Sequence, residues 1–465
     1  MSDFSELTVE VYRNLDYEPL PSQARVIAAL CAYAVGRKWR DVALLNGYAG
    51  TGKTSIIGAY VKALKKLKIN SVVLAPTGRA AKVASYFTGG PASTIHKRIY
   101  RADSPTPDAR FFLSPNKDKD TVFIVDEASL ITDDKDQQKS LLSQLIRHIY
   151  AAPGCGLIFV GDEAQLPPVG NEDSPAMNTK RLIELGLNPI RMSLRQPVRQ
   201  ASESGILYNA TILRRMLQKG MTERFPYLSI RGFKDVRIVS GTNLADSISD
   251  SWSEVGAEET LIVTRSNYRA NEFNKAVRNL VMAADEPLQR GDRLVISKND
   301  YYWSRKNELK NFIANGDIAI VEWVGHTRKE YGRYFCEVEL FFPTEDTRIS
   351  ANLMLRSLMA EGPVLPRVEM EQFYSNVLAC QEGDSLSKKI KGVMDDPYYN
   401  ALHAKYGYCV TCHKAQGGQW KHVYIDLSGI ARESLSRDFY RWCYTAITRA
   451  TEKVMFVNPS FKIRE

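Results

Sequence analysis

The sequence predicts an α/β protein built from two parallel-sheet lobes. Short runs of apolar, often β-branched residues recur along the chain, and amphipathic segments separate them. Such runs are typical of strands that are buried on both faces of a parallel sheet and joined by crossover helices. The runs form an early group ending near Val160 and a later group beginning near Leu261, so two lobes are expected within the 465 residues.

The expected strands and helices follow from these runs. The early strands lie at residues 42–45, 71–75, 122–125 and 157–160. The later strands lie at residues 261–264, 423–427 and 454–457. Amphipathic spacing predicts crossover helices at residues 55–67 and 137–150.

Two segments depart from this pattern. Residues 104–108 read Ser-Pro-Thr-Pro-Asp, a turn signal flanked by aromatic residues, which predicts a hairpin inserted in the first lobe. Alternating strand-like segments such as residues 334–342 predict a β-rich insertion in the second lobe, with a polar helix late in it. The expected boundaries are 1–86 and 118–190 for the first lobe, 87–117 for the hairpin, 191–287 and 405–465 for the second lobe, and 288–404 for the β-rich insertion.

The composition favours an anionic partner and excludes a membrane span. Lys and Arg number 62 against 53 Asp and Glu, which leaves a net charge of +9 and suits nucleic acid. The longest nearly uncharged apolar run, residues 26–35, is shorter than the ~20 residues that a spanning helix needs. The acidic first residues do not resemble a secretory signal, so we expect a cytoplasmic protein, or one of the host cytoplasm if a phage encodes it.

The seven cysteines are an odd number spread along a long chain, which predicts reduced thiols. Cys409, Cys412 and His413 fit the spacing of a c-type haem attachment or half of a zinc site. No second Cys pair lies nearby in the sequence, and haem attachment normally follows export. We therefore expect these cysteines to be packing residues.

A phosphate-binding loop is the most specific motif in the sequence. Residues 47–54 read Gly-Tyr-Ala-Gly-Thr-Gly-Lys-Thr, directly after an expected strand and before an expected helix. The backbone of such a loop turns its N–H groups toward phosphate oxygens, while the lysine reaches the β- and γ-phosphates and the last hydroxyl holds Mg²⁺. The expected nucleotide-binding residues of the loop are Gly47, Ala49, Gly50, Thr51, Gly52, Lys53 and Thr54.

Acidic residues complete this expected site. Asp126 and Glu127 directly follow the strand at residues 122–125. Asp126 is expected to bind Mg²⁺ through its water shell, and Glu127 to orient and deprotonate the attacking water. Gln165 follows the next strand, at the edge where α/β sheets bind ligands, and is a candidate for sensing the γ-phosphate.

Taken together, these motifs resemble superfamily 1 helicases of the 5′-to-3′ branch typified by RecD and the phage helicase Dda. Further segments carry the resemblance: residues 20–23, 75–82, 92–96, 192–200, 410–417 and 444–450. The resemblance implies two RecA-like lobes and an SH3-like insertion, with ATP and Mg²⁺ as cofactors. It also implies that Gln23 lies against adenine, that Arg199 and Arg449 reach the γ-phosphate, and that Gln416 and Gly417 face the nucleotide.

The same resemblance implies an ATP-driven motor that moves 5′ to 3′ on single-stranded DNA and unwinds duplex. Its expected partners are single strands and single-strand/duplex junctions, and it is expected to act as a monomer. The resemblance assigns Pro76, Thr77, Thr94, His96, Thr411 and His413 to the DNA strand. Phe111 and Phe112 near the hairpin tip are candidates for a wedge against the opened base pair.

Three other functions remain open from the sequence. An RNA-directed helicase of the same superfamily fits, because phosphate and stacking contacts do not specify the sugar. An ATP-gated single-strand-binding protein without unwinding activity would also use these motifs. A P-loop kinase for a small molecule fits less well, because it leaves Arg449 and the segment around His413 unexplained.

Overall fold

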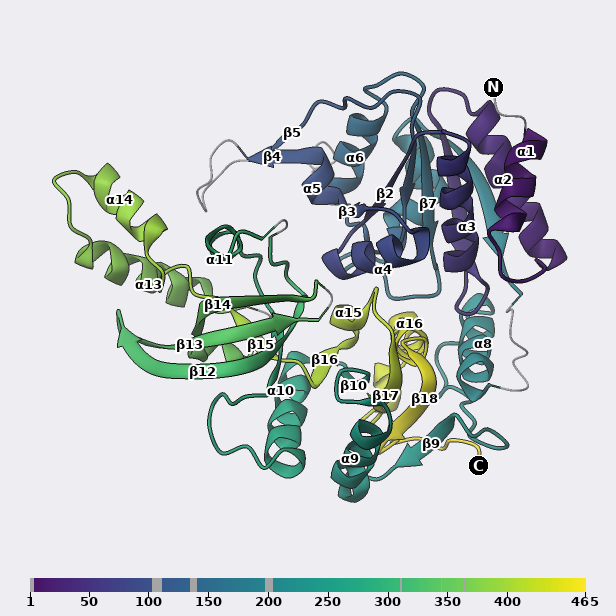
Figure 1. The fold of residues 1–465 in the computed structure, drawn as a ribbon. Coiled ribbons are helices and arrows are strands. Elements are labelled where there is room, and N and C mark those ends of the chain that lie inside the picture. Colours follow the sequence, from purple (N-terminus) through teal and green to yellow (C-terminus); the bar gives the residue numbers. More distant parts are fainter. Residues whose placement is uncertain are drawn as a thin grey trace.

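The computed structural model describes residues 4–102, 111–133, 140–196, 204–309, 312–343, 345–362 and 364–465. Two α/β lobes lie one above the other, and an insertion lies beside the second lobe (Figure 1). The N-terminus belongs to the first lobe and the C-terminus to the second (Figure 1). The α/β class with parallel-sheet lobes is therefore confirmed.

The first lobe is built on a six-stranded parallel sheet in the order β3-β2-β6-β7-β1-β8. Its strands are β1 (Asp41–Gly47), β2 (Ser71–Ala75), β3 (Ala92–Thr94), β6 (Val122–Val125), β7 (Gly156–Gly161) and β8 (Asn188–Leu194). Its helices are α1 (Phe4–Arg13), α2 (Pro21–Gly36), α3 (Lys53–Lys66), α4 (Gly78–Thr88), α5 (Ile95–Ile99), α6 (Leu141–Ile149) and α7 (Thr179–Glu184).

Alternation along the strands explains the two cores of this lobe. Ala43 and Leu45 of β1 pack with helices α1 to α4 on one face. Val42 and Leu44 of the same strand pack with α5, α6 and α7 on the other face. Because successive side chains of a strand point to opposite faces, a strand covered on both sides must be apolar throughout.

The second lobe holds a five-stranded parallel sheet in the order β16-β10-β17-β18-β9. Its strands are β9 (Val236–Val239), β10 (Thr260–Thr264), β16 (Cys409–Thr411), β17 (Trp420–Asp426) and β18 (Ala450–Val457). Its helices are α8 (Gly205–Gln218), α9 (Leu244–Val255), α10 (Asn267–Ala276), α15 (Cys412–Ala415) and α16 (Arg437–Ile447). Helices α8 and α16 cover one face of the sheet, and α9 and α10 cover the other.

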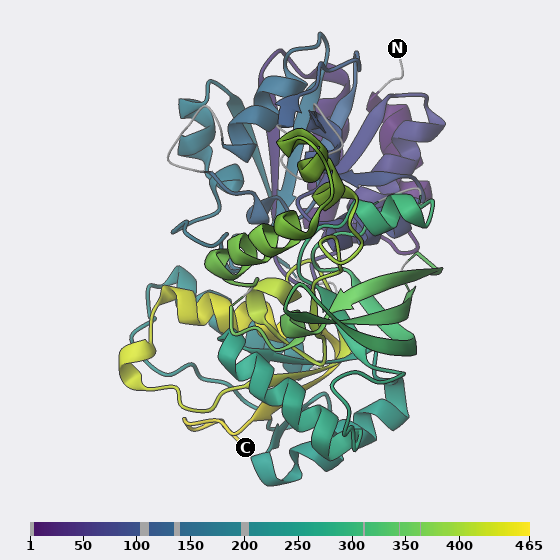
Figure 2. The ribbon, with the colours of Figure 1, turned by 90° about the vertical axis from the view of Figure 1, so that its left-hand side faces the viewer.

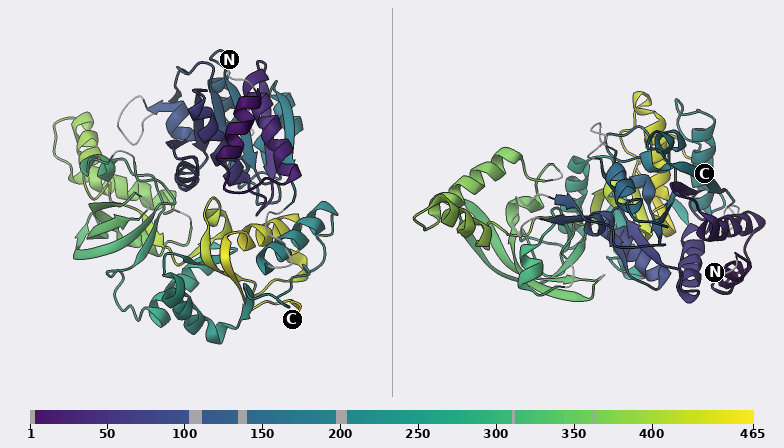
Figure 3. Two further views of the ribbon diagram at one scale, coloured as in Figure 1. Left: turned by 45° about the vertical axis from the view of Figure 1, so that its right-hand side comes forward. Right: turned by 90° about the horizontal axis from the view of Figure 1, so that it is seen from above.

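The insertion contains a five-stranded antiparallel sheet in the order β14-β13-β12-β11-β15. Its strands are β11 (Arg293–Ile296), β12 (Ile318–Glu330), β13 (Arg333–Phe342), β14 (Thr347–Met354) and β15 (Ala404–Tyr406). Its helices are α11 (Tyr302–Lys306), α12 (Leu355–Leu358), α13 (Arg367–Cys380) and α14 (Leu386–Asp395). Helices α13 and α14 form a pair that projects beyond this sheet, away from the second lobe (Figures 2 and 3).

The expected hairpin is present as β4 (Tyr100–Ala102) and β5 (Phe111–Leu113), which pair antiparallel from Tyr100↔Leu113 to Ala102↔Phe111. The turn signal at residues 104–108 lies outside the described residues. The hairpin leaves the first lobe directly after α5, so it extends from the same sheet edge that carries β3.

Several boundaries differ from the expected ones. Strand β8 pairs with β1, so the first sheet extends to Leu194 rather than ending at residue 190. In this edge strand only Met192 and Leu194 are buried, and the strand contains Pro189, so it lacks the apolar run of a buried strand. Strand β3 belongs to the first sheet although residues 87–117 were expected to be hairpin, and β15 pairs with β11, which extends the insertion to Tyr406. The insertion also holds a helical pair where one polar helix was expected.

Candidate nucleotide and nucleic-acid sites

The loop between β1 and α3 has the backbone of a phosphate cradle. Gly50 and Gly52 adopt φ angles of 72° and 83°, in the left-handed region that favours glycine. The Thr51 hydroxyl donates to the carbonyl of Tyr48 at 2.7 Å. The Lys53 ammonium donates to the carbonyls of Gly47 and Tyr48 and thus folds back over the loop. An ammonium in this position needs only a side-chain rotation to meet phosphate oxygens above the loop.

Gln23 lies against this loop. The side chain is fully buried, and its Nε2 donates to the carbonyl of Thr51 at 3.0 Å. Its Oε1 accepts from the backbone N–H of Leu20 at 2.9 Å, which fixes the amide at the start of α2. The structure therefore brings Gln23 to the nucleotide loop, and its contact with adenine remains a prediction.

Asp126 and Glu127 follow β6 at the same carboxyl edge of the sheet. The N–H of Glu127 donates to Asp126 Oδ1 at 2.9 Å, and Glu127 adopts a left-handed φ of 50°. Burial and the charge of Glu127 raise the pKa of Asp126, while the Lys53 charge acts in the opposite direction. A cation beside Asp126 would stabilise its charged form. The Thr54 hydroxyl and the Asp126 carboxylate supply the oxygen ligands that Mg²⁺ prefers, so these residues fit the ion.

The loop after β7 is held by the second lobe. The Tyr444 hydroxyl donates to Asp162 Oδ2 at 2.7 Å and accepts from the N–H of Ala49 at 2.9 Å. The N–H of Leu166 donates to Thr445 Oγ1, and Gln416 Nε2 donates to the Leu166 carbonyl, both at 2.8 Å. Gln416 thus meets the loop that carries Gln165 rather than the phosphate-binding loop.

Gln165 lies between the two anchored ends of this loop. The side chain is buried, and its Oε1 has no hydrogen-bond partner among the described residues. A buried amide oxygen without a partner costs free energy, so this side chain is ready to accept a new contact. Sensing of the γ-phosphate by Gln165 remains a prediction.

Of the two arginines expected at the γ-phosphate, the structure describes one. Arg199 lies outside the described residues. Arg449 is buried, and its guanidinium donates to the carbonyls of Thr445 at 3.0 Å and Gly418 at 3.1 Å and to the Thr448 hydroxyl at 3.2 Å. All three acceptors belong to the second lobe. In this conformation the side chain that reaches the phosphate-binding loop from α16 is Tyr444.

Polar contacts also join the lobes away from the nucleotide loop. Arg441 of α16 donates to the Glu172 carbonyl at 2.6 Å and to Asp173 Oδ1 at 2.5 Å. The Arg79 guanidinium of α4 stacks on the Trp420 ring at 3.9 Å. Burial and the charges of Arg293 and Arg449 lower the pKa of Arg79 to about 9. The two lobes therefore form a continuous body in this conformation.

Two expected strand-contacting motifs of the first lobe share one sheet edge. Ala75 at the end of β2 is paired with Thr94 at the end of β3, so Pro76, Thr77, Thr94 and His96 lie together. The hydroxyls of Thr77 and Thr94 cap α4 and α5, each accepting from a backbone N–H at 3.2 Å. Both helices therefore begin at this edge, where their free N–H groups favour an anion.

The second lobe presents a matching edge. Thr264 at the end of β10 is paired with Thr411 at the end of β16, and His413 is exposed one residue beyond Cys412. Gly417 lies against the start of α4, because a Cβ there would be 3.6 Å from the Thr77 hydroxyl and 3.3 Å from the Ala80 Cβ. Gly417 thus joins the strand-contacting edge of the first lobe, whereas the sequence assigned it to the nucleotide. Contact of these residues with DNA remains a prediction.

The hairpin presents one described aromatic side chain. Phe112 is 49% exposed and is paired with Arg101 on β4. The side chain of Phe111 lies outside the described part of the chain. An exposed ring on a two-stranded projection is available for stacking, and its use as a wedge remains a prediction.

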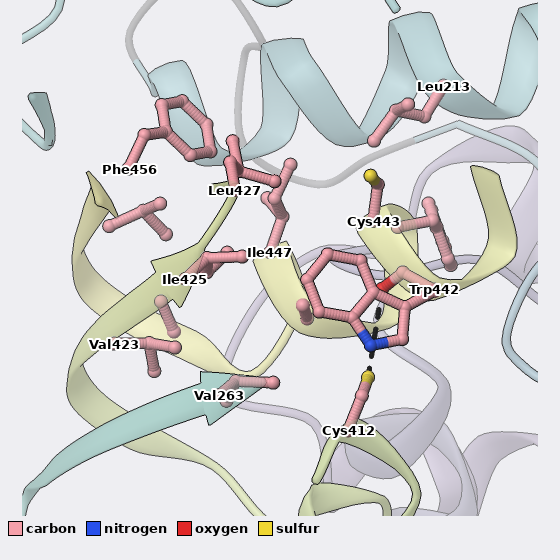
Figure 4. Close-up of a cluster of buried hydrophobic side chains, with 14 of the residues drawn as sticks. Leu213, Val263, Cys412, Val423, Ile425, Leu427, Trp442, Cys443, Ile447 and Phe456 are labelled. Carbon is pink, nitrogen blue, oxygen red and sulfur yellow. Dashed lines mark hydrogen bonds between the residues drawn. The ribbon is translucent and has the colours of Figure 1, made fainter. Parts of the chain in front are cut away.

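Cys409 and Cys412 are packing residues. Both are buried, and Cys412 lies beneath α16, where its thiol donates to the Trp442 carbonyl at 3.7 Å (Figure 4). Burial raises the pKa of Cys412 to about 12, which disfavours the thiolate that a metal needs. Within the described residues, no three His, Cys, Asp or Glu side chains are grouped to hold a metal ion.

Comparisons with known proteins match both lobes. The model of an AAA domain matches residues 21–204, and that of a UvrD-like helicase C-terminal domain matches residues 406–457. The RecD2 DNA helicase of Deinococcus radiodurans is 24% identical over 88% of this chain and 46% of its own length. The Dda DNA helicase of phage T4 is 26% identical over 55% of this chain and 56% of its own.

A solved structure is similar to this chain in fold. The Pif1 helicase from Bacteroides, in complex with ADP-AlF3 and single-stranded DNA, superposes with a TM-score of 0.51 at 15% identity and covers 96% of this chain and 94% of its own. Both lobes of the chain therefore resemble those of superfamily 1B helicases. The chain spans about half the length of the RecD2 and Dda relatives that it matches.

The contact between the lobes involves residues to which the sequence assigned no role. Tyr444 and Thr445 stand inside the last motif of the sequence, yet only Arg449 was assigned there. Asp162 stands in the loop where only Gln165 was assigned. Their buried position facing the opposite lobe is a property of the folded protein, and no spacing in the sequence indicates it. Among the described residues, no helix has the length and apolar character to cross a bilayer.

Proposed function

We propose that this protein is an ATP-dependent DNA helicase that moves 5′ to 3′ along a single strand and unwinds duplex as a monomer. The supporting observation is that the two lobes contact each other at two junctions. At the first, Tyr444 of the second lobe contacts Ala49 and Asp162 beside the nucleotide loop. At the second, Gly417 lies against Thr77 at the expected strand-contacting edge. We infer that a change at one junction is transmitted to the other.

The residues expected to bind ATP would promote its hydrolysis mainly by positioning the phosphates and the water and by neutralising phosphate charge. Lys53 and the N–H groups of the loop would hold the β- and γ-phosphates, and Glu127 would orient and deprotonate the attacking water. Mg²⁺ held by Thr54 and Asp126 would neutralise phosphate charge. An arginine brought in from across a cleft adds ~10³ to 10⁵ in rate, so Arg449 must leave its second-lobe acceptors to act.

The protein would move along the strand if the two lobes bound it alternately. Thr77 and Thr94 would hold phosphates for the first lobe, and Thr411 and His413 for the second, without reading sequence. Closure of the lobes around ATP would bring their strand-binding residues together, and hydrolysis would allow the lobes to separate. Opening a duplex costs on the order of 1.4 kcal/mol per base-pair step, which Phe112 would help to meet by stacking on the opened pair.

The choice of DNA and of direction rests on the relatives. RecD2 and Dda are named DNA helicases, and the Pif1 structure contains single-stranded DNA. The 5′-to-3′ direction rests on family resemblance. An RNA substrate, or ATP-gated binding without unwinding, remains the competing function.

Strand displacement from tailed duplexes tests the proposal. Duplexes with a 5′ or a 3′ single-stranded tail, made of DNA or RNA, are incubated with the protein, ATP and Mg²⁺. We expect displacement from the 5′-tailed DNA alone. Displacement only from the 3′-tailed DNA refutes the direction, displacement only with RNA tails favours the RNA helicase, and ATP-dependent binding without displacement favours the binding protein.

A further inference from the structure

The Tyr444 hydroxyl of the second lobe makes two hydrogen bonds to the first lobe. It accepts from the N–H of Ala49 in the phosphate-binding loop and donates to Asp162 in the loop after β7. Tyr444 is 1% exposed and Asp162 is fully buried. One hydroxyl of the second lobe therefore binds two separate elements of the first-lobe nucleotide site.

The hydrogen bonding fixes the state of this hydroxyl. Burial, followed by the neighbouring Asp162 charge, raises the pKa of Tyr444, so the phenol keeps its proton and can donate. The other Asp162 oxygen accepts from the N–H of Ala164 at 2.9 Å. The charge on a fully buried carboxylate depends on such donors, and Tyr444 supplies one from the opposite lobe.

The next residues extend the contact on both sides. Thr445 accepts from the N–H of Leu166, so Tyr444 and Thr445 together hold both ends of the loop that carries Gln165. The carbonyl of the same Thr445 accepts from Arg449 Nε at 3.0 Å. Two hydrogen bonds, joined through the peptide link between Tyr444 and Thr445, thus connect Ala49 to the arginine expected to complete catalysis.

We propose that Tyr444 is a positioning residue of the ATPase, whose hydroxyl transmits the state of the phosphate-binding loop to α16 and thereby sets Arg449. This inference rests on the proposed function and deepens it. When a triphosphate fills the loop, the amide of Ala49 and the loop of Asp162 shift together, and Tyr444 carries that shift across the cleft. The hydroxyl itself touches no reacting atom.

The substitution Tyr444→Phe removes the hydroxyl and keeps the ring that packs in α16. Tyr440→Phe is the matched control, because Tyr440 lies one turn earlier on α16, is fully buried, and donates to the Arg224 carbonyl of its own lobe at 2.6 Å. Displacement of a reacting group by about 1 Å can cost ~10²-fold in rate. We expect Tyr444→Phe to lower the kcat of DNA-stimulated ATP hydrolysis by about tenfold to 100-fold.

Three measurements distinguish a positioning role of Tyr444 from a role in folding. The affinity for a fluorescent ATP analogue should change by less than about twofold in Tyr444→Phe, since the loop itself is intact. The unfolding midpoint should match that of Tyr440→Phe, whose turnover stays near that of the unaltered protein. Combined with Asp162→Asn, the Tyr444→Phe effect should be less than additive, because both changes break one interaction.

Hydrogen exchange provides a measurement that does not depend on turnover. The peptide that spans residues 47–54 should exchange about tenfold faster in Tyr444→Phe than in Tyr440→Phe, because the Ala49 amide loses its acceptor. Turnover of Tyr444→Phe within about twofold of the unaltered protein, equal losses in Tyr440→Phe, or fully additive effects overturn the inference alone. An unaltered protein without DNA-stimulated hydrolysis overturns the proposed function, and this inference with it.

Discussion

Tyr444 and Asp162 are 282 positions apart in the chain, yet the phenol of one donates to the carboxylate of the other at 2.7 Å. This contact closes the space between the lobes beside the phosphate-binding loop. A nucleotide bound to that loop would therefore lie beside a contact with the second lobe.

Lys53→Ala should lower ATP turnover by at least about 10²- to 10³-fold, because the loop loses the cation that meets the phosphates. Binding of single-stranded DNA, measured by fluorescence anisotropy, should persist. Lys53 begins α3 after β1, and β6 and β7 separate β1 from β2 and β3, which carry the expected strand-contacting edge. Lys62→Ala is the control, because Lys62 is exposed on the same helix α3. Equal turnover in both variants would show that the loop does not bind ATP productively.

Arg449→Ala should lower kcat by about 10³-fold and change the affinity for an ATP analogue little, because the arginine acts on the transition state. The variant also frees the carbonyls of Thr445 and Gly418, which costs about 1–3 kcal/mol of stability, so its fold is checked at the assay temperature. Arg437→Ala, at an exposed position at the start of α16 with an ion pair to Asp173, is the control. Near-normal turnover in Arg449→Ala would remove the arginine from the mechanism.

Lys82→Met should weaken the contact between the first lobe and the insertion. Lys82 of α4 pairs with Asp317 at 3.1 Å and with Glu345, and Asp317 is 6% exposed at its side chain. The loss leaves a buried carboxylate with one fewer donor, which costs about 1–3 kcal/mol. Thermal unfolding measures it, with Lys421→Met as control, since Lys421 and its partner Glu452 are both exposed. A midpoint no lower than that of the control would contradict the assignment.

Chelation should stop ATP hydrolysis without unfolding the protein. EDTA removes the Mg²⁺ expected at Thr54 and Asp126, and added Mg²⁺ should restore turnover. The unfolding midpoint of the nucleotide-free protein should stay within about 1 °C, because Cys409 and Cys412 pack against neighbours and bind no structural metal. A clear fall in the midpoint with EDTA would instead reveal a metal centre.

Much of the fold was predictable because its strands are buried on both faces. The strands near residues 42–45, 122–125 and 157–160 are continuous apolar runs, and each lies in the sheet as expected. The phosphate-binding loop was predictable for a related reason. Its glycines are required by left-handed φ angles at residues 50 and 52, so the spacing itself encodes the geometry.

The remaining features depend on tertiary contacts that leave no local pattern. In edge strand β8 only Met192 and Leu194 are buried, so its assignment to the first sheet follows only from its pairing with β1. Gln416 was expected beside the nucleotide, and its partner Leu166 is 250 positions away in the chain. Arg449 was expected at the γ-phosphate, while the structure holds it on second-lobe acceptors. These partners are set by the three-dimensional packing of the chain, and that of Gln416 by the contact between the lobes.

The central claim is that nucleotide binding moves one lobe against the other. Single-molecule energy transfer between dyes at Lys65→Cys on α3 and Ser253→Cys on α9 measures this directly, with the exposed Cys380 replaced by serine. We predict distinct transfer efficiencies for the nucleotide-free protein and for the protein with an ATP analogue and single-stranded DNA, and no difference in Lys53→Ala. One unchanged efficiency in every state would contradict the account.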